Sequence, residues 1–141
     1  MKTIRWGIIG CGDVTEKKSG PGLQKADGSS LVAVMRRNSE KAADYAKRHD
    51  VPRWYDDAQS LIDDPEVDAV YIATPPSSHM EYTFKAAEAG KPVYCEKPLG
   101  VSSEQSKKMV AFCKEKKVPL FSAYYRRALP KYLTIKALID S

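Results

Sequence analysis

The sequence predicts an α/β fold of the doubly wound kind, with a mainly parallel six-stranded sheet. Short apolar runs rich in β-branched residues recur along the chain, for example at residues 4–9, 31–35 and 68–74. Runs that are apolar at consecutive positions are typical of parallel strands covered by helices on both faces. They alternate with segments whose apolar residues have helical spacing, which indicates βαβ units. In addition, the first run leads directly into two glycines, Gly10 and Gly12, and then into a polar segment that can begin a helix.

The turn after the first strand is the first candidate binding site. Residues 4–14 read I-R-W-G-I-I-G-C-G-D-V. A glycine at position 10 permits a tight turn, and a glycine at position 12 lets a bulky anion approach the backbone. The N–H groups at the start of the next helix would then face a phosphate. The sequence therefore predicts a phosphate-binding turn formed by Gly10, Cys11, Gly12, Asp13 and Val14.

The match to the dinucleotide pattern G-x-G-x-x-G/A is partial, because Thr15 stands where a third small residue is usual. This replacement puts the close packing of the helix on the strand in question, rather than the phosphate site. A glycine turn of an unrelated α/β protein is the alternative reading of the motif.

Length and charge limit the classes of protein to consider. The 141 residues fit one domain, and the net charge of +5 arises from a basic excess after residue 100. This excess could indicate a nucleic-acid-binding protein. However, the lysines of residues 107–117 are interleaved with Met109, Val110, Phe112 and Cys113. This spacing favours the solvated face of an amphipathic helix, and we expect no nucleic-acid partner.

The cysteines indicate the compartment. Cys11, Cys95 and Cys113 are odd in number and lack the spacing of metal ligands. The sequence also shows no signal peptide and no long apolar span. We therefore expect a cytoplasmic protein without a structural metal and without a membrane partner.

The first helix is predicted to be irregular. Residues 13–18 can begin it, and residues 23–26 can continue it. Between them, Ser19, Gly20, Pro21 and Gly22 predict a break or an inserted loop beside the phosphate turn. A simple linker and a loop that touches a ligand are both open.

The end of the second strand bears on the choice of cofactor. In dinucleotide folds an acidic residue about twenty positions after the glycines binds the ribose diol, whereas an arginine accommodates a 2′-phosphate. This chain has Arg36, Arg37 and Asn38 at that place, and its first carboxylate there is Glu40. A guanidinium can bind phosphate with two hydrogen bonds and can stack on adenine. The arginines favour NADP over NAD, and NAD and simple loop solvation are the alternatives.

The following elements are predicted from caps and periodicity. Asn38 or Ser39 can cap a helix that runs to about His49, and residues 51–55 form a short third strand. Asp56 or Asp57 can cap a short helix before the fourth strand at residues 68–74. Residues 78–81 fit a capping box for the next helix, with Met80, Phe84 and Ala87 as its buried stripe.

The bend after the fourth strand is the second candidate binding segment. Ala73, Thr74, Pro75 and Pro76 form a rigid segment at the carboxyl end of a strand, where ligands lie in open α/β sheets. His79 follows in the first turn of the helix. It is expected either to assist the helix cap or to contact the cofactor.

The fifth strand, residues 91–95, leads into Glu96, Lys97 and Pro98. A lysine at the carboxyl end of a parallel strand can polarise a carbonyl or move the proton of an alcohol. Its neighbour Glu96 could keep the lysine charged or bind the cofactor. An exposed ion pair beside a turn proline is the alternative.

Three segments together resemble a known family. They are G-I-I-G-C-G-D-V at the start, A-T-P-P-S-S-H at residues 73–79 and A-G-K-P-V-Y-C-E-K-P-L at residues 89–99. The chain resembles, over essentially its whole length, the glucose–fructose oxidoreductase, inositol dehydrogenase and rhizopine-catabolism family of NAD(P)-dependent oxidoreductases. The resemblance implies a Rossmann domain with the six-stranded sheet described above.

The resemblance also assigns roles to residues. It implies that Lys97 is the catalytic lysine, beside the substrate and the nicotinamide of the cofactor, that Glu96 lies against the cofactor and that the Lys97–Pro98 bond is cis. It places residues 73–76 along the nicotinamide half of the cofactor. The segment after a sixth strand at residues 119–124 would lie near the cofactor, with an arginine of residues 124–127 as a possible contact.

The resemblance implies a two-domain enzyme. We therefore expect residues 1–141 to be the cofactor-binding domain and a C-terminal substrate domain to be absent from this chain. The substrate would be a sugar, a polyol or a similar small molecule. The last predicted helix, residues 130–140, is apolar around most of its circumference, so we expect it to be covered and the protein to form homo-oligomers. A non-catalytic dinucleotide sensor is the alternative function.

Overall fold

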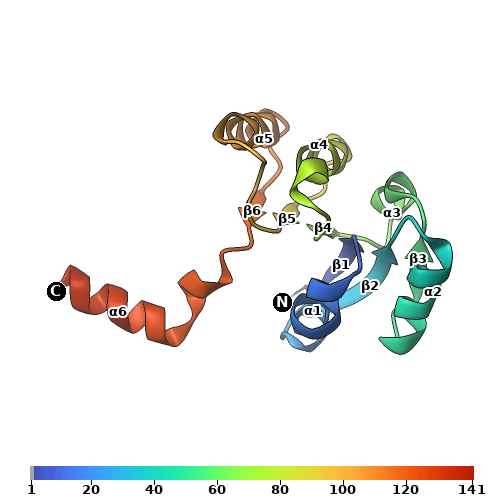
Figure 1. The fold of residues 1–141 in the computed structure, drawn as a ribbon, viewed down its shortest axis with the longest axis horizontal. Helices are drawn as coiled ribbons and strands as arrows, with labels where there is room; N and C mark the ends of the chain where they lie inside the picture. Colours follow the sequence, from blue (N-terminus) through green and yellow to red (C-terminus); the bar gives the residue numbers. More distant parts are fainter. Residues whose placement is uncertain (1) are drawn as a thin grey trace.

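The structure is a computed structural model that describes residues 2–141. Its strands are β1 (Ile4–Ile9), β2 (Ser29–Met35), β3 (Arg53–Tyr55), β4 (Ala69–Ile72), β5 (Val93–Cys95) and β6 (Leu120–Ser122). They form one six-stranded sheet in the order β3-β2-β1-β4-β5-β6, and every neighbouring pair is parallel (Figure 1). The predicted doubly wound α/β fold is confirmed, with an entirely parallel sheet.

Helices connect the strands. They are η1 (Thr15–Ser19), α1 (Gly20–Lys25), α2 (Ser39–Arg48), α3 (Ala58–Asp63), η2 (Pro76–Ser78), α4 (His79–Glu88), α5 (Ser103–Glu115), η3 (Tyr125–Ala128) and α6 (Pro130–Asp140). Two of the predicted caps are confirmed. Asn38 accepts a hydrogen bond from the Lys41 N–H at 2.8 Å, and Asp57 accepts one from the Ser60 N–H at 2.8 Å.

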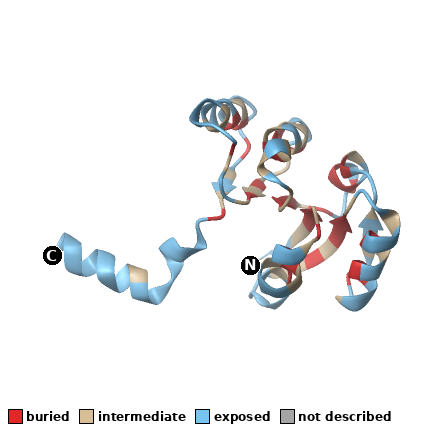
Figure 2. Ribbon diagram, in the orientation of Figure 1, coloured by how far each residue is buried: buried red, intermediate tan, exposed pale blue. Residues whose placement is uncertain are grey.

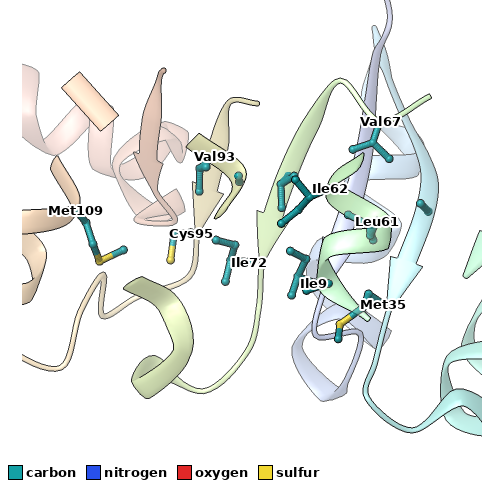
Figure 3. Packing of buried hydrophobic residues seen from close by; sticks show 13 residues of the cluster. Ile9, Met35, Leu61, Ile62, Val67, Ile72, Val93, Cys95 and Met109 are labelled. Carbon is teal, nitrogen blue, oxygen red and sulfur yellow. The ribbon is translucent and has the colours of Figure 1, made fainter. Parts of the chain in front are cut away.

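The core has two layers because successive strand residues point to opposite faces of the sheet. Ile9 and Ile72 pack against Leu61 of α3, in the cluster that also contains Met109 of α5 (Figure 3). Ile8 and Tyr71, the sequence neighbours of Ile9 and Ile72, lie on the other face of the sheet. They belong to a second cluster that also contains Val34, Tyr45 of α2 and Leu23 of α1. Burying each large apolar side chain contributes about 1.5–3 kcal/mol before the entropy cost of folding. Figure 2 shows the buried residues concentrated in the strands and on the inner sides of the helices.

The predicted break at residues 19–22 is wrong. The chain passes from the π-helix η1 directly into α1, and Pro21 lies in the first turn of α1. A π-helix pairs residues five apart, and accordingly the Gly20 N–H donates to the carbonyl oxygen of Thr15. The helix thus absorbs the Gly-Pro-Gly sequence by changing its period.

The predicted capping box at residues 78–81 is also wrong. The Ser78 hydroxyl bonds Thr74 Oγ1 and the carbonyl oxygen of Pro75, so it does not cap α4. The predicted buried stripe of α4 is confirmed at Ala87 only, because Met80 and Phe84 are partly buried and the other buried residues are His79, Thr83 and Ala86.

The last helix, α6, extends away from the sheet, and none of its residues is buried (Figures 1 and 2). Its exposed apolar residues include Leu133, Ile135, Leu138 and Ile139. In contrast, α5 has the predicted amphipathic form, with Met109 and Cys113 buried. Among the helices within residues 2–141, none has the length and apolar character that crossing a membrane requires.

Candidate functional site

The candidate site lies at the carboxyl edge of the sheet, where the strand order reverses between β1 and β4. Ligands of doubly wound folds bind at this kind of switch point. A first cavity of about 380 Å³ opens there, lined by residues that follow β1, β2 and β4. Its lining comprises Gly10, Cys11, Gly12, Met35, Arg36, Arg37, Asn38, Lys41, Ala73, Thr74, Pro75 and Tyr82.

The conformation of the turn after β1 depends on Gly10. Gly10 has φ +92°, a region that side chains rarely adopt, and a Cβ there would lie 2.7 Å from Thr74 Cγ2. The N–H groups of Gly10 and Cys11 both donate to the carbonyl oxygen of Met35, at 2.9 and 3.0 Å. The turn is therefore fixed from both sides, by β2 and by the segment after β4.

The next residues of the turn leave room for a ligand. A Cβ on Gly12 would have no atom nearer than the carbonyl oxygen of Gly10 at 4.0 Å, so this side of the backbone is open. The Gly12 N–H donates to Thr15 Oγ1 at 2.9 Å, and that hydroxyl donates to the Gly12 carbonyl oxygen at 2.8 Å. Since the first N–H groups of a helix have no intrahelical acceptor, those of Asp13 and Val14 are the ones available to an anion.

Thr15 stands at the position where the glycine pattern usually has a third small residue. It is fully buried, and its carbonyl oxygen accepts a hydrogen bond from Tyr45 Oη at 2.9 Å. The threonine side chain is accommodated within the fold, where its hydroxyl bonds both the N–H and the carbonyl oxygen of Gly12 and closes the turn. Its hydroxyl takes the place of a ligand at the Gly12 N–H.

Three cations line the first cavity. Arg36 is half-buried, and one of its guanidinium nitrogens lies 3.4 Å from the carbonyl oxygen of Cys11. Arg37 and Lys41 are exposed and line the same cavity. Within residues 2–141 none of these three cations forms an ion pair with a carboxylate. Lys41 did not figure in the sequence prediction, although its place in the first turn of α2 after the two arginines was a usable signal.

A second cavity, of about 600 Å³, borders the later residues of the same turn. It brings together Asp13 and Val14 from the turn with Glu96 and Lys97 from the segment after β5. Its remaining lining residues are Lys18, Ala123, Tyr124, Tyr125 and Arg126. The sequence indicated the region of Arg126 but not Lys18, which lies in η1.

The segment after β5 is held by hydrogen bonds. Tyr71 Oη donates to Glu96 Oε1 at 2.7 Å, and the Lys97 N–H donates to Glu96 Oε2 at 3.1 Å. Burial, reinforced by the adjacent Glu96, raises the pKa of Tyr71 far above its ordinary value, so the phenol remains the donor. The Lys97–Pro98 bond is cis, as the resemblance implied. These two hydrogen bonds orient Glu96, which lines the second cavity beside Lys97.

His79 and Pro76 line neither cavity. His79 is fully buried, with Nε2 2.8 Å from the carbonyl oxygen of Thr74 and Nδ1 3.0 Å from that of Pro98. Both ring nitrogens thus lie against backbone carbonyl oxygens, and contact between His79 and a cofactor stays a prediction. The imidazole joins the segment after β4 to the turn that carries Lys97.

Two further features of the site concern the ionisation of Cys11 and metal binding. Burial raises the pKa of Cys11 to about 11, so the thiol in the turn is protonated near neutral pH. Within residues 2–141 no group of three or more His, Cys, Asp or Glu side chains could hold a metal ion. The open face of Gly12, the helix-start N–H groups and the cations of the first cavity fit a phosphate-bearing dinucleotide.

Comparisons with known proteins agree with this geometry. Residues 4–124 match the model of the oxidoreductase family with an NAD-binding Rossmann fold. An oxidoreductase from Formosa agariphila is 51% identical over 138 residues, which cover 98% of this chain and 43% of that protein.

Solved structures are similar as well. A 3-ketoreductase from Actinomadura kijaniata in complex with NADP and TDP-benzene superposes with a TM-score of 0.91 at 27% identity, covering 99% of this chain and 42% of that one. Scyllo-inositol dehydrogenase from Lactobacillus casei, with bound NAD(H) and scyllo-inositol, gives a TM-score of 0.89 at 25% identity, covering 99% and 41%.

The present chain thus spans less than half the length of these relatives. The family model nevertheless covers the glycine turn, the arginines after β2 and the segment after β5. The chain belongs to the oxidoreductase family with an NAD-binding Rossmann fold.

Proposed function

We propose that this chain is the cofactor-binding domain of an NADP-dependent dehydrogenase or reductase acting on a sugar, a polyol or a similar hydroxyl or carbonyl compound. One observation carries the proposal. The turn after β1 contributes Gly10–Gly12 to the first cavity and Asp13 and Val14 to the second. A dinucleotide bound through this turn can therefore extend from Arg36 and Arg37 at one end to Lys97 at the other.

The preference for NADP rests on charge. An acidic residue at the end of β2 would repel a 2′-phosphate, whereas Arg36, Arg37 and Lys41 can all approach it with unpaired positive charge. Each hydrogen bond between such a cation and a phosphate contributes about 1.5–3 kcal/mol.

Calorimetric titration with NADP and NAD tests this preference. We expect NADP to bind at least tenfold more tightly, and Arg37→Ala to remove most of the difference by weakening NADP roughly tenfold to a hundredfold. Lys41→Gln should weaken NADP as well, whereas Lys47→Gln, on an exposed face of the same helix, is the matched control and should not. Equal affinities, or tighter binding of NAD, would contradict the assignment.

The chain's own residues would act on the second reactant as follows. A bound nicotinamide supplies the hydride acceptor or donor. Lys97 lies at the wall of the second cavity and would hold or move the proton of the substrate oxygen. Glu96, fixed by the Tyr71 hydroxyl and the Lys97 N–H, would orient the lysine and lie against the cofactor.

Replacement of Lys97 in the full-length protein distinguishes an enzymatic function from that of a non-catalytic sensor. We expect Lys97→Met to lower kcat about 10²- to 10⁴-fold while the Kd for NADP changes less than threefold. A sensor would show no turnover in the unaltered protein and a cofactor response that does not depend on Lys97.

The proposal extends to the larger protein. A substrate domain outside residues 1–141 would supply further acid–base residues and complete the second cavity, and the exposed apolar residues of α6 would be covered in a homo-oligomer. We also propose that the protein is cytoplasmic, which the three free cysteines support.

A further inference from the structure

The helix that follows the glycine turn begins in an unusual form. The π-helix η1 covers Thr15–Ser19, and single π-helical turns occur frequently at functional sites. The carbonyl oxygen of Thr15 accepts hydrogen bonds from the Gly20 N–H and from Tyr45 Oη, and the latter measures 2.9 Å. A Cβ on Gly20 would lie 2.3 Å from this oxygen and 2.5 Å from Tyr45 Oη. The geometry of η1 therefore depends on glycine at position 20.

Lys18 belongs to this helix, η1. Lys18 lines the second cavity together with Lys97 and Arg126, and it also lines an adjoining cavity of about 370 Å³. Lys17, its neighbour on the same turn, lines none of these cavities. Among residues 2–141, neither Lys18 nor Arg126 forms an ion pair.

The charges around the second cavity are not balanced for a neutral ligand. Three cations, Lys18, Lys97 and Arg126, face two carboxylates, Asp13 and Glu96. Glu96 is engaged by Tyr71 and by the backbone. A proton transfer at one substrate oxygen requires only Lys97, so the other two cations are in excess of what a hydroxyl or carbonyl group needs.

We propose that the second cavity accepts a sugar or polyol that carries a carboxylate, such as a uronic acid, and that Lys18 and Arg126 bind this carboxylate while Lys97 faces the reacting oxygen. The proposal rests on the proposed function and specifies its substrate class. A guanidinium pairs with a carboxylate through two parallel hydrogen bonds, and a lysine adds a mobile ammonium group. Lys18 is thus a specificity-determining residue in the geometry that η1 and Gly20 impose.

Steady-state kinetics of the full-length protein with NADP test the proposal on matched sugars. Glucuronate and glucose differ only in the C6 group, as do galacturonate and galactose, and glucose 6-phosphate provides a different anion. We expect kcat/KM to be at least tenfold higher for the better acid than for its neutral partner. Lys18→Gln should raise the KM for the acid roughly tenfold to a hundredfold and leave the neutral sugar unchanged. Lys18→Arg should retain most of the preference, and Lys17→Gln should change neither value.

Several results would overturn this assignment. They are a preference for the neutral sugars, a preference for glucose 6-phosphate over glucuronate, and an acid preference that survives in Lys18→Gln. Calorimetry with NADP gives a further test. If Lys18→Gln weakens NADP binding as much as it raises the KM for the acid, Lys18 is a cofactor ligand and the assignment is refuted.

Failure of the proposed function gives a different pattern. If no sugar is turned over, but glucuronate still binds the NADP-loaded protein in a manner that depends on Lys18, the oxidoreductase reaction is refuted and the carboxylate site stands. If glucuronate neither reacts nor binds, the carboxylate site is refuted as well.

Discussion

Replacing Gly20 with alanine tests the link between η1 and the rest of the domain. The added Cβ would lie 2.3 Å from the carbonyl oxygen of Thr15 and 2.5 Å from Tyr45 Oη. Neither atom can retreat easily, since the first belongs to the backbone and Tyr45 is 1% exposed. The helix must therefore shift, and the Tyr45–Thr15 hydrogen bond must lengthen or break.

The magnitude follows from these two effects. Overpacking a buried site costs about 1–3 kcal/mol. Leaving a buried hydrogen-bonding group unpaired costs about 1–3 kcal/mol more, while alanine returns about 1 kcal/mol of helix propensity. The net loss in the free energy of unfolding is about 3 kcal/mol. With an m-value of about 2 kcal/mol per molar urea, the midpoint of urea unfolding should fall by about 1.5 M.

Gly22→Ala is the matched control, because a Cβ at this position of the same helix meets no atom within 4 Å. It should raise the free energy of unfolding by about 0.5–1 kcal/mol. Urea unfolding followed by circular dichroism measures both variants. If Gly20→Ala unfolds at the same urea concentration as Gly22→Ala, the close packing around η1 is refuted.

Three further predictions concern ionisation and buried groups. The Arg48 guanidinium lowers the pKa of Glu16 to about 2, so the stability that this pair contributes is present above about pH 5 and is lost as the pH falls toward 2. Urea unfolding at pH 7, 5 and 3 should show that the free energy of unfolding falls less with decreasing pH in Glu16→Gln than in the unaltered protein, and the same fall in both proteins would contradict this. Tyr71→Phe removes the donor to Glu96 and should lower kcat of the full-length protein about tenfold at nearly constant NADP affinity, whereas an unchanged kcat would show that the hydrogen bond does not orient Glu96. Burial raises the pKa of Cys95 to about 12, and all three thiols are buried, so mass spectrometry should find no iodoacetamide adduct on the native protein at pH 8 and three adducts in urea; rapid labelling of the native protein would contradict the burial.

Much of the fold follows from local sequence patterns. Consecutive apolar residues predicted each of the buried strands, because a parallel strand buried on both faces needs apolar side chains at odd and even positions alike. The glycine turn was predictable for a similar local reason, since Gly10 must adopt φ +92°. Asn38 and Asp57 were predictable as helix caps because a cap bonds an N–H only three residues ahead.

The errors arise where hydrogen-bond partners differ from those that spacing and composition suggest. Ser78 has the right spacing for a capping box, but its hydroxyl bonds Thr74 and Pro75 on the loop below. The place of His79 in the first turn of the helix was predictable, but the position of its ring beside the carbonyl oxygens of Thr74 and Pro98 was not. The Gly-Pro-Gly sequence was expected to break the helix, but Tyr45 and the π-helical period stabilise it.

The sequence by itself therefore determined the class of fold, the order of its elements and the chemical types of residue at the carboxyl edge of the sheet. Apolar periodicity, glycine conformation and helix capping are short-range effects that a chain carries in its own residues. The tertiary structure alone decided that Tyr45 binds the carbonyl oxygen of Thr15, that Tyr71 orients Glu96 and that Lys18 lines the cavity of Lys97. These three outcomes depend on which strands and helices lie next to one another, because a hydrogen bond or a shared cavity forms only after packing has brought distant segments within a few ångströms.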